Sequence, residues 1–102
     1  MLTRNRRPTN PGKILKTYYL EPRALSIAQL ARATGLSRKQ VSGVANGRTA
    51  VSPDTAVRFA RVLDTTARFW LNLQNAVDLY DVRQRLAGWQ PSEVHPAKLT
   101  VE

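Results

Sequence analysis

The chain has 102 residues, no cysteine and a formal net charge of +9, so we expect one small domain without disulfide bonds. No apolar run is long enough to span a membrane, and no apolar segment follows the first arginines as in a signal peptide, so we expect a cytoplasmic protein without membrane contact. Residues 1–50 hold ten lysines and arginines against one acid, whereas the rest of the chain holds six of each. Such one-sided charge is typical of a protein that binds a polyanion, although a merely solvated basic surface is the alternative.

The first ten residues are basic and polar, without apolar periodicity, and are predicted to form a flexible arm over residues 1–10. Arg4, Arg6 and Arg7 either reach phosphates or a minor groove, or belong to a solubilising tail that makes no contact.

A capping residue and a proline at the first helical position, Asn10 and Pro11, then begin a helix. We expect it to end at Glu21, because the residue before a proline is disfavoured in the α region. Apolar side chains follow at helical spacing: Ile14, Leu15, Tyr18 and Tyr19.

The next two predicted helices are short and joined by a tight turn. Ser26 caps a helix over Ile27–Thr34, Gly35 ends it, and Ser37 caps a second helix over residues 38–46.

This pair of helices meets the spacing requirements of a helix-turn-helix. Ala31 is small where the helices touch, and Gly35 supplies a positive φ at the turn four residues later. Leu36 follows the turn, and Val41 and Val44 hold the second helix against the first. An ordinary helical hairpin is the weaker alternative, because it does not require this combination.

Two further helices complete the prediction. Ser52 caps one that ends near Leu63, and Thr66 caps a longer one that ends near Leu86. No alternating apolar pattern suited to a strand occurs before residue 90.

The domain organisation follows from these elements. We expect an all-α, compact five-helix domain over residues 11–86, which contains the helix-turn-helix and a dimerisation surface, and a tail over residues 87–102.

The exposed face of the second helix of the motif carries the candidate base-reading side chains. Arginine suits guanine, glutamine and asparagine suit adenine, and serine suits either, although each residue taken singly is as easily a solvated surface group. No acid lies between Glu21 and Asp54 to repel phosphate. The predicted base-reading residues are Ser37, Arg38, Lys39, Gln40, Ser42 and Asn46.

Contacts to the DNA backbone, which position a protein without reading sequence, are predicted from the residues that flank this helix. The first turns of both helices also present free amides to phosphate. The predicted backbone contacts are Ser26, Gln29, Arg48 and Thr49.

The last predicted helix offers a dimer interface. Its apolar stripe is wider than one small core needs, and two-fold symmetry doubles the contacts to DNA. A ligand pocket is the weaker alternative for its aromatic residues. The predicted interface residues are Trp70, Leu71, Leu73, Leu79 and Val82.

Catalysis and metal binding are not expected. The one histidine, His95, lies in the tail and cysteine is absent, which removes His-based triads and most zinc sites. No Gly-rich phosphate loop is present, and Asp78 and Asp81 are more often a solvated pair than a cation site. We therefore expect no enzyme activity, no metal and no cofactor.

Several runs of the sequence resemble the HigA-type antitoxins, within the xenobiotic-response-element and phage-repressor group of helix-turn-helix proteins. The resemblance covers about residues 7–84, and its most specific part is the combination of PGKIL with FWLNLQ. The runs are RPTNPGKIL, LEP, ARATGLSRKQVSGVANGR, VSPDTAVRFARVL and TTARFWLNLQNAVDL.

This resemblance implies an antitoxin of a type II toxin–antitoxin module. Such a protein binds a small basic RelE-like toxin that cleaves mRNA, and as a dimer it binds operator DNA and represses its own operon. By position, the base-reading surface falls on Arg38, Lys39, Gln40 and Ser42, and the helix of Trp70 and Leu73 contributes to the dimer. A stand-alone repressor without a toxin is the main alternative, and an interaction module that has lost DNA binding is a third.

The sequence departs from the pattern of these antitoxins at three positions. Lys39 stands where a glutamine is frequent, so the operator is expected to differ. Gly43 is expected on the exposed face of the reading helix, where close approach to DNA would explain a glycine. Asp64 stands where many relatives have a helix-ending glycine.

Overall fold

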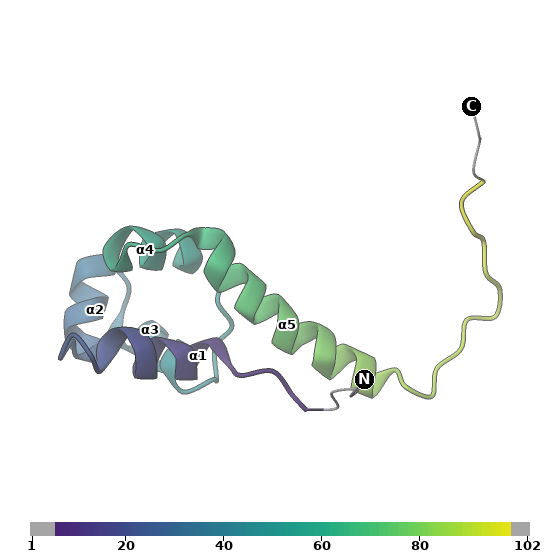
Figure 1. Ribbon diagram of the computed structural model, residues 1–102, viewed down its shortest axis with the longest axis horizontal. Coiled ribbons are helices and arrows are strands. Elements are labelled where there is room, and N and C mark those ends of the chain that lie inside the picture. Colours follow the sequence, from purple (N-terminus) through teal and green to yellow (C-terminus); the bar gives the residue numbers. More distant parts are fainter. Residues whose placement is uncertain (1–5, 99–102) are drawn as a thin grey trace.

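The computed structural model describes residues 6–98, which form helices and, within that range, no strand (Figure 1). In chain order the elements are α1 (Pro11–Ile14), the π-helix η1 (Leu15–Leu20), α2 (Ile27–Thr34), α3 (Arg38–Ala45), α4 (Pro53–Leu63) and α5 (Ala67–Arg85). Because η1 continues α1 without a break, these elements are the five helices predicted, and the all-α class is confirmed.

Each of the five helices begins at the polar residue that the sequence predicts. The capping side chain accepts a hydrogen bond from a backbone N–H in the first helical turn, which satisfies a donor that the helix leaves unpaired. The caps are Asn10, Ser26, Ser37, Ser52 and Thr66.

The second half of the first helix is wound more widely than predicted. Its backbone hydrogen bonds join residues five apart, as in a π-helix. Leu15 and Leu20 are spaced by five, and both are buried. Ile14 and Tyr19 form a second such pair and pack against the same core. Tyr18, which regular α spacing would place with Ile14, is instead 62% exposed.

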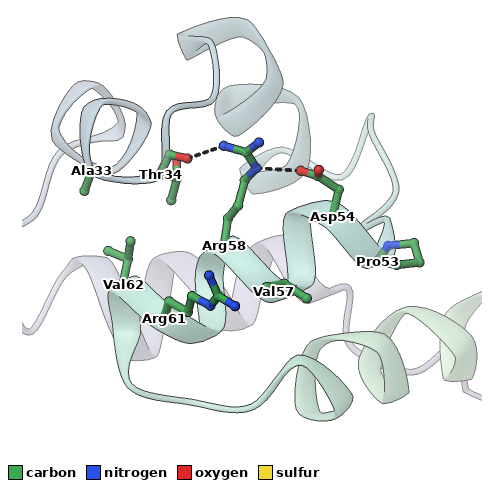
Figure 2. Close-up of a pocket in the computed structure, with 8 residues that line it drawn as sticks. All are labelled: Ala33, Thr34, Pro53, Asp54, Val57, Arg58, Arg61 and Val62. Atoms are coloured by element: carbon green, nitrogen blue, oxygen red, sulfur yellow. Dashed lines mark hydrogen bonds and ion pairs between the residues drawn. The ribbon is translucent and has the colours of Figure 1, made fainter.

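The turn of the helix-turn-helix is confirmed at Gly35, whose φ of 77° lies in the left-handed region. Arg58 of α4 supports this turn, as Figure 2 shows: its Nη1 donates to the carbonyl oxygen of Thr34 at 2.7 Å, and its Nε donates to Asp54 at 2.6 Å. Asp64, with φ 59°, ends α4 in the same left-handed conformation, which aspartate tolerates better than most residues.

Trp70 lies at the centre of the core. Its side chain is completely buried, and its indole N–H donates to the Thr65 hydroxyl at 2.7 Å. The rings of Tyr19, Phe59 and Phe69 surround it, with centroids 5.3, 5.4 and 5.0 Å away. This corrects the prediction that Trp70 contributes to the dimer surface, because a side chain without exposed area joins α5 to the other helices and meets no second copy.

The far half of α5 and the tail extend beyond the packed body (Figure 1). The radius of gyration is 17.8 Å, against about 13 Å for a compact domain of this length. The chain with its arm and tail is therefore more extended than a compact domain of the same length. The last four residues of the predicted tail lie outside the described residues.

Among the described residues, an ion pair holds the predicted arm against α5. Arg7 forms two hydrogen bonds with the Asp81 carboxylate of α5, from Nε and Nη2, each at 2.9 Å. Neither alternative given for Arg7, a contact with DNA or a tail without contacts, included this pair, which forms because the first helix begins beside α5. Arg6 is exposed, and Arg4 lies outside the described residues.

Candidate nucleic-acid interface

The first turn of α3 carries two positively charged side chains that are exposed to solvent. Arg38 and Lys39 are exposed, and neither forms a hydrogen bond or ion pair with any described residue. No carboxylate is present in the sequence between Glu21 and Asp54, so α2 and α3 present no negative side chain. Two unpaired cations on a capped helix are suited to a polyanion that carries base-edge acceptors.

Capping boxes hold four of the predicted contact residues in fixed positions. Gln40 N–H donates to Ser37 Oγ, and Ser37 N–H donates to Gln40 Oε1, both at 3.0 Å. Ser26 and Gln29 form the same reciprocal pair at the start of α2, at 3.0 and 2.8 Å. Each serine hydroxyl hydrogen and each glutamine NH₂ group remains able to donate, so these side chains are both structural and available to an acceptor.

Asn46 has a different environment from the one predicted for a free base-reading residue. Its Nδ2 donates to the carbonyl oxygen and hydroxyl of Ser42 at 2.9 and 3.2 Å. Its Oδ1 accepts from Lys16 Nζ at 3.4 Å. Both ends of the amide are therefore engaged within the protein, and Asn46 links η1 to α3.

Gly43 lies on the inner side of α3, which corrects the expectation of an exposed position. It is buried, and a Cβ there would lie 3.0 Å from the Cβ of Thr49 and closer still to the Thr49 hydroxyl. Its carbonyl oxygen accepts from the N–H groups of Arg48 and Thr49 at 2.8 and 3.0 Å. The glycine therefore allows the chain after α3 to fold back over the helix, while the side chains of Arg48 and Thr49 stay exposed beside it.

Lys13 and Lys16 were missed by sequence reasoning as members of this surface. With Asn46 and Gly47 they line an open cavity of about 440 Å³ at the carboxyl end of α3. The three-residue spacing of the two lysines on the first helix is visible in the sequence, but their position beside α3 depends on how the helices cross.

A second groove, of about 640 Å³, lies between α2 and α4 (Figure 2). Ala33, Val57 and Val62 form apolar parts of its lining, and Arg58 and Arg61 are its basic residues. It contains none of the residues predicted to contact DNA.

The predicted dimer surface is exposed at its far end. Leu79 is 50% exposed, whereas Leu71, Leu73 and Val82 are half-buried. Leu71 and Leu73 also pack against the core of the same chain. Pro8 of the arm and Leu79 together line a third open cavity, of about 600 Å³, so the arm borders this surface.

The Asp81 carboxylate of α5 accepts both hydrogen bonds from Arg7 of the arm. The hydrogen bonds from Arg7 lower the pKa of Asp81, and the positive charge of the guanidinium acts in the same direction. The pKa of Arg7 is raised by the same pair. Asp78, three residues earlier, instead accepts a hydrogen bond from Gln74 at 2.9 Å. Nowhere in residues 6–98 do three potential metal-binding side chains cluster.

Known proteins resemble this chain in sequence and in structure. A helix-turn-helix family model matches residues 17–70. The antitoxin HigA-1 of Vibrio cholerae is 44% identical, over 78% of this chain and 75% of its own length. The antitoxin GraA superposes with a TM-score of 0.77 at 41% identity, over 80% of this chain and 88% of its own. The Pseudomonas aeruginosa antitoxin HigA, solved with the higBA promoter, gives 0.80 at 34% identity, over 88% and 98%.

None of the described helices has the length and apolar character needed to cross a membrane.

Proposed function

The chain belongs to the HigA-type antitoxin family of helix-turn-helix proteins, and from this premise we propose that it binds operator DNA as a dimer, represses its own operon, and neutralises a small basic RelE-like toxin. Proteins of this family are transcriptional regulators and antitoxins and are not enzymes.

The observation that carries the DNA-binding proposal is the pair Arg38 and Lys39. Both are exposed and unpaired among the described residues, on the first turn of a helix whose start is fixed by a capping box. A rigid start to α3 is what base reading requires, because a side chain on a frayed turn loses more conformational entropy on binding. The Pseudomonas aeruginosa HigA was solved with its promoter, which supports the same class of ligand here.

The dimer proposal rests on the far half of α5. Leu79 on α5 is 50% exposed, and Leu86, directly after the end of α5, is 44% exposed, where the helix extends beyond the packed body. One helix-turn-helix reads only a few base pairs, so a second copy is needed for a defined operator. The balanced charge of residues 51–102 allows two such halves to approach without strong repulsion.

Selection of bound duplexes from a random pool tests the DNA and dimer proposals together. We expect an inverted repeat with half-site centres about 10 bp apart, or a small multiple of that spacing. Enrichment of a single asymmetric half-site would contradict the dimer, and the absence of any enriched sequence would contradict base reading.

The toxin proposal rests on family membership, and its test is independent of DNA. The neighbouring gene is sequenced, and any small basic reading frame found there is expressed alone and together with the chain. We expect growth arrest and mRNA cleavage from the reading frame alone, relief on co-expression, and one complex in size-exclusion chromatography. If no adjoining gene encodes a toxin that binds the chain, a stand-alone repressor is the function that fits better.

A further inference from the structure

A basic cavity lies at the carboxyl end of α3, and of the residues that the sequence assigns to DNA only Asn46 lines it. Lys13, Lys16, Asn46 and Gly47 line it, with Thr17 on the same wall, in an open volume of about 440 Å³. We propose that Lys13 and Lys16 form a second phosphate-binding subsite for the backbone of the duplex that α3 reads, and that Asn46 positions Lys16 there. This inference rests on the proposed DNA binding.

Lys16 is a cation without a negative partner. Its side chain is half-buried, it donates a hydrogen bond to the neutral amide of Asn46, and residues 6–98 supply no carboxylate within ion-pair distance. Partial burial removes water from an ammonium group, and a charge-assisted bond to an anion compensates for that loss better than an amide oxygen does. A phosphate oxygen in the cavity provides that anion.

The cavity continues the surface that faces the bases. Arg38 and Ser42 of α3 and Asn46, which caps its end, follow one another at four-residue spacing, so they share one side of the helix. Asn46 donates to Ser42 and accepts from Lys16, which extends the same side onto η1 through a continuous chain of hydrogen bonds. A duplex whose groove receives the first turn of α3 therefore brings a backbone past the other end of that helix.

Asn46 is better described as a positioning residue than as a base reader. Its amide oxygen accepts from Lys16 and its amide nitrogen donates to Ser42, so the bidentate contact that asparagine makes with adenine would compete with these bonds. Its removal is expected to weaken binding to all sequences alike, without changing which bases are preferred.

Glu21 opposes the subsite and provides a control of opposite sign. It lines the same cavity and is the one acidic residue in the first fifty, so its charge repels a phosphate held by the lysines. Glu21→Gln should therefore tighten binding, whereas Lys13→Gln and Lys16→Gln should weaken it. Arg61→Gln, in the groove between α2 and α4, removes a positive charge from another face and should change neither affinity nor salt dependence.

The test is a fluorescence titration of the full chain with a 30-bp duplex of arbitrary sequence, repeated over a range of salt concentrations. The slope of log affinity against log salt should fall by about 0.9 for each lysine replaced, and by about 1.8 for both. Lys16→Arg should retain the slope because it retains the charge. Asn46→Ala should weaken binding in the same direction as Lys16→Gln, and the double variant should be no weaker than Lys16→Gln alone. A thermal melt of each variant establishes that it is folded.

The outcomes separate this inference from the proposed function. If the lysine variants keep the wild-type slope while Arg38→Ala loses affinity, the chain binds DNA through α3 and the second subsite is wrong. If Asn46→Ala changes the preferred base at one position and leaves the slope unchanged, Asn46 reads a base and its positioning role is wrong. If inorganic phosphate binds to Lys13 and Lys16 at saturating concentration but does not lower the affinity of the chain for the duplex, the site binds an anion other than DNA. A wild-type chain that binds no duplex would overturn both proposals.

Discussion

Gly12 lies so close to Ala45 that a Cβ atom on the glycine would come within 2.5 Å of the alanine carbonyl oxygen. The contact joins α1 to the last turn of α3, backbone against backbone. Because Lys13 follows this glycine directly, and Lys16 lies one helical turn further on, the same contact sets how the basic cavity is placed relative to the reading helix.

Gly12→Ala should destabilise the domain by about 1–3 kcal/mol, because the added methyl group overlaps main-chain atoms that have no alternative rotamer. Denaturant unfolding of the purified variant measures the change. Gly88→Ala is the matched control, since a Cβ there meets no atom within 4 Å, and it should leave the midpoint unchanged. An equal loss of stability in the Gly12→Ala and Gly88→Ala variants would mean that the packing of α1 against α3 does not depend on Gly12.

Gly35→Val should lower stability by about 1–3 kcal/mol, because a β-branched residue is strained at a φ of 77°. A Cβ at this position would also lie 3.0 Å from Arg58 Nη1, the group that bonds Thr34. Gly35→Asn should cost less, since asparagine tolerates the left-handed region. Thermal melts of the two variants give the comparison, and a valine variant as stable as wild type would contradict the turn assignment.

The Arg7–Asp81 pair should give the arm a pH dependence. The pKa of Asp81 is lowered in the folded chain, so the pair stabilises the docked arm above the ordinary carboxyl pKa of about 3.9. That contribution is lost as the pH falls through the lowered value. Arg7→Gln should raise the pKa of Asp81 toward its ordinary value, as measured by a ¹³C NMR titration of the carboxyl carbon.

Arg61→Gln, which removes one positive charge from α4, is the control for this titration and should leave the Asp81 pKa where it is. A pKa of Asp81 that does not respond to Arg7→Gln would show that the arm is not held by this pair in solution.

Leu79→Asp should give a folded monomer that has lost most of its operator affinity. A carboxylate on a half-exposed surface position costs a lone chain little, but it is costly when a second copy covers it. Sedimentation velocity measures the mass. Val57→Asp, at a 39% exposed position on α4, is the control and should stay dimeric. A Leu79→Asp variant that remains dimeric would show that the dimer interface lies elsewhere. A monomeric Val57→Asp variant would show that the second copy binds at the groove formed by α2 and α4.

The local chemistry of the fold is predictable from the sequence. A cap acts within three residues of itself, so Ser26 and Ser37 identify the starts of their helices without knowledge of any neighbour. The same holds for Gly35, whose left-handed conformation is required by a turn between two adjacent helices. These features place the exposed pair Arg38 and Lys39 at the start of α3.

Most of the differences from prediction involve contacts between distant segments. Gly43 is small because Thr49 folds back against it, and no helical pattern encodes that return. Trp70 belongs to the core because Tyr19 reaches it from a π-helical turn, whose five-residue spacing differs from the α spacing assumed. Asn46, whose base reading stays a prediction, has an environment that the sequence does not reveal, because Lys16, thirty residues earlier, lies beside it.

The most direct test of base reading by α3 is a titration of the double variant Arg38→Ala, Lys39→Ala on the duplex obtained by selection. Arg38→Ala alone should cost about 1–3 kcal/mol and relax the preference at one base pair of each half-site. The double variant should bind the selected duplex no more tightly than an unrelated one. Operator affinity that survives both substitutions would contradict the assignment of α3 as the reading helix.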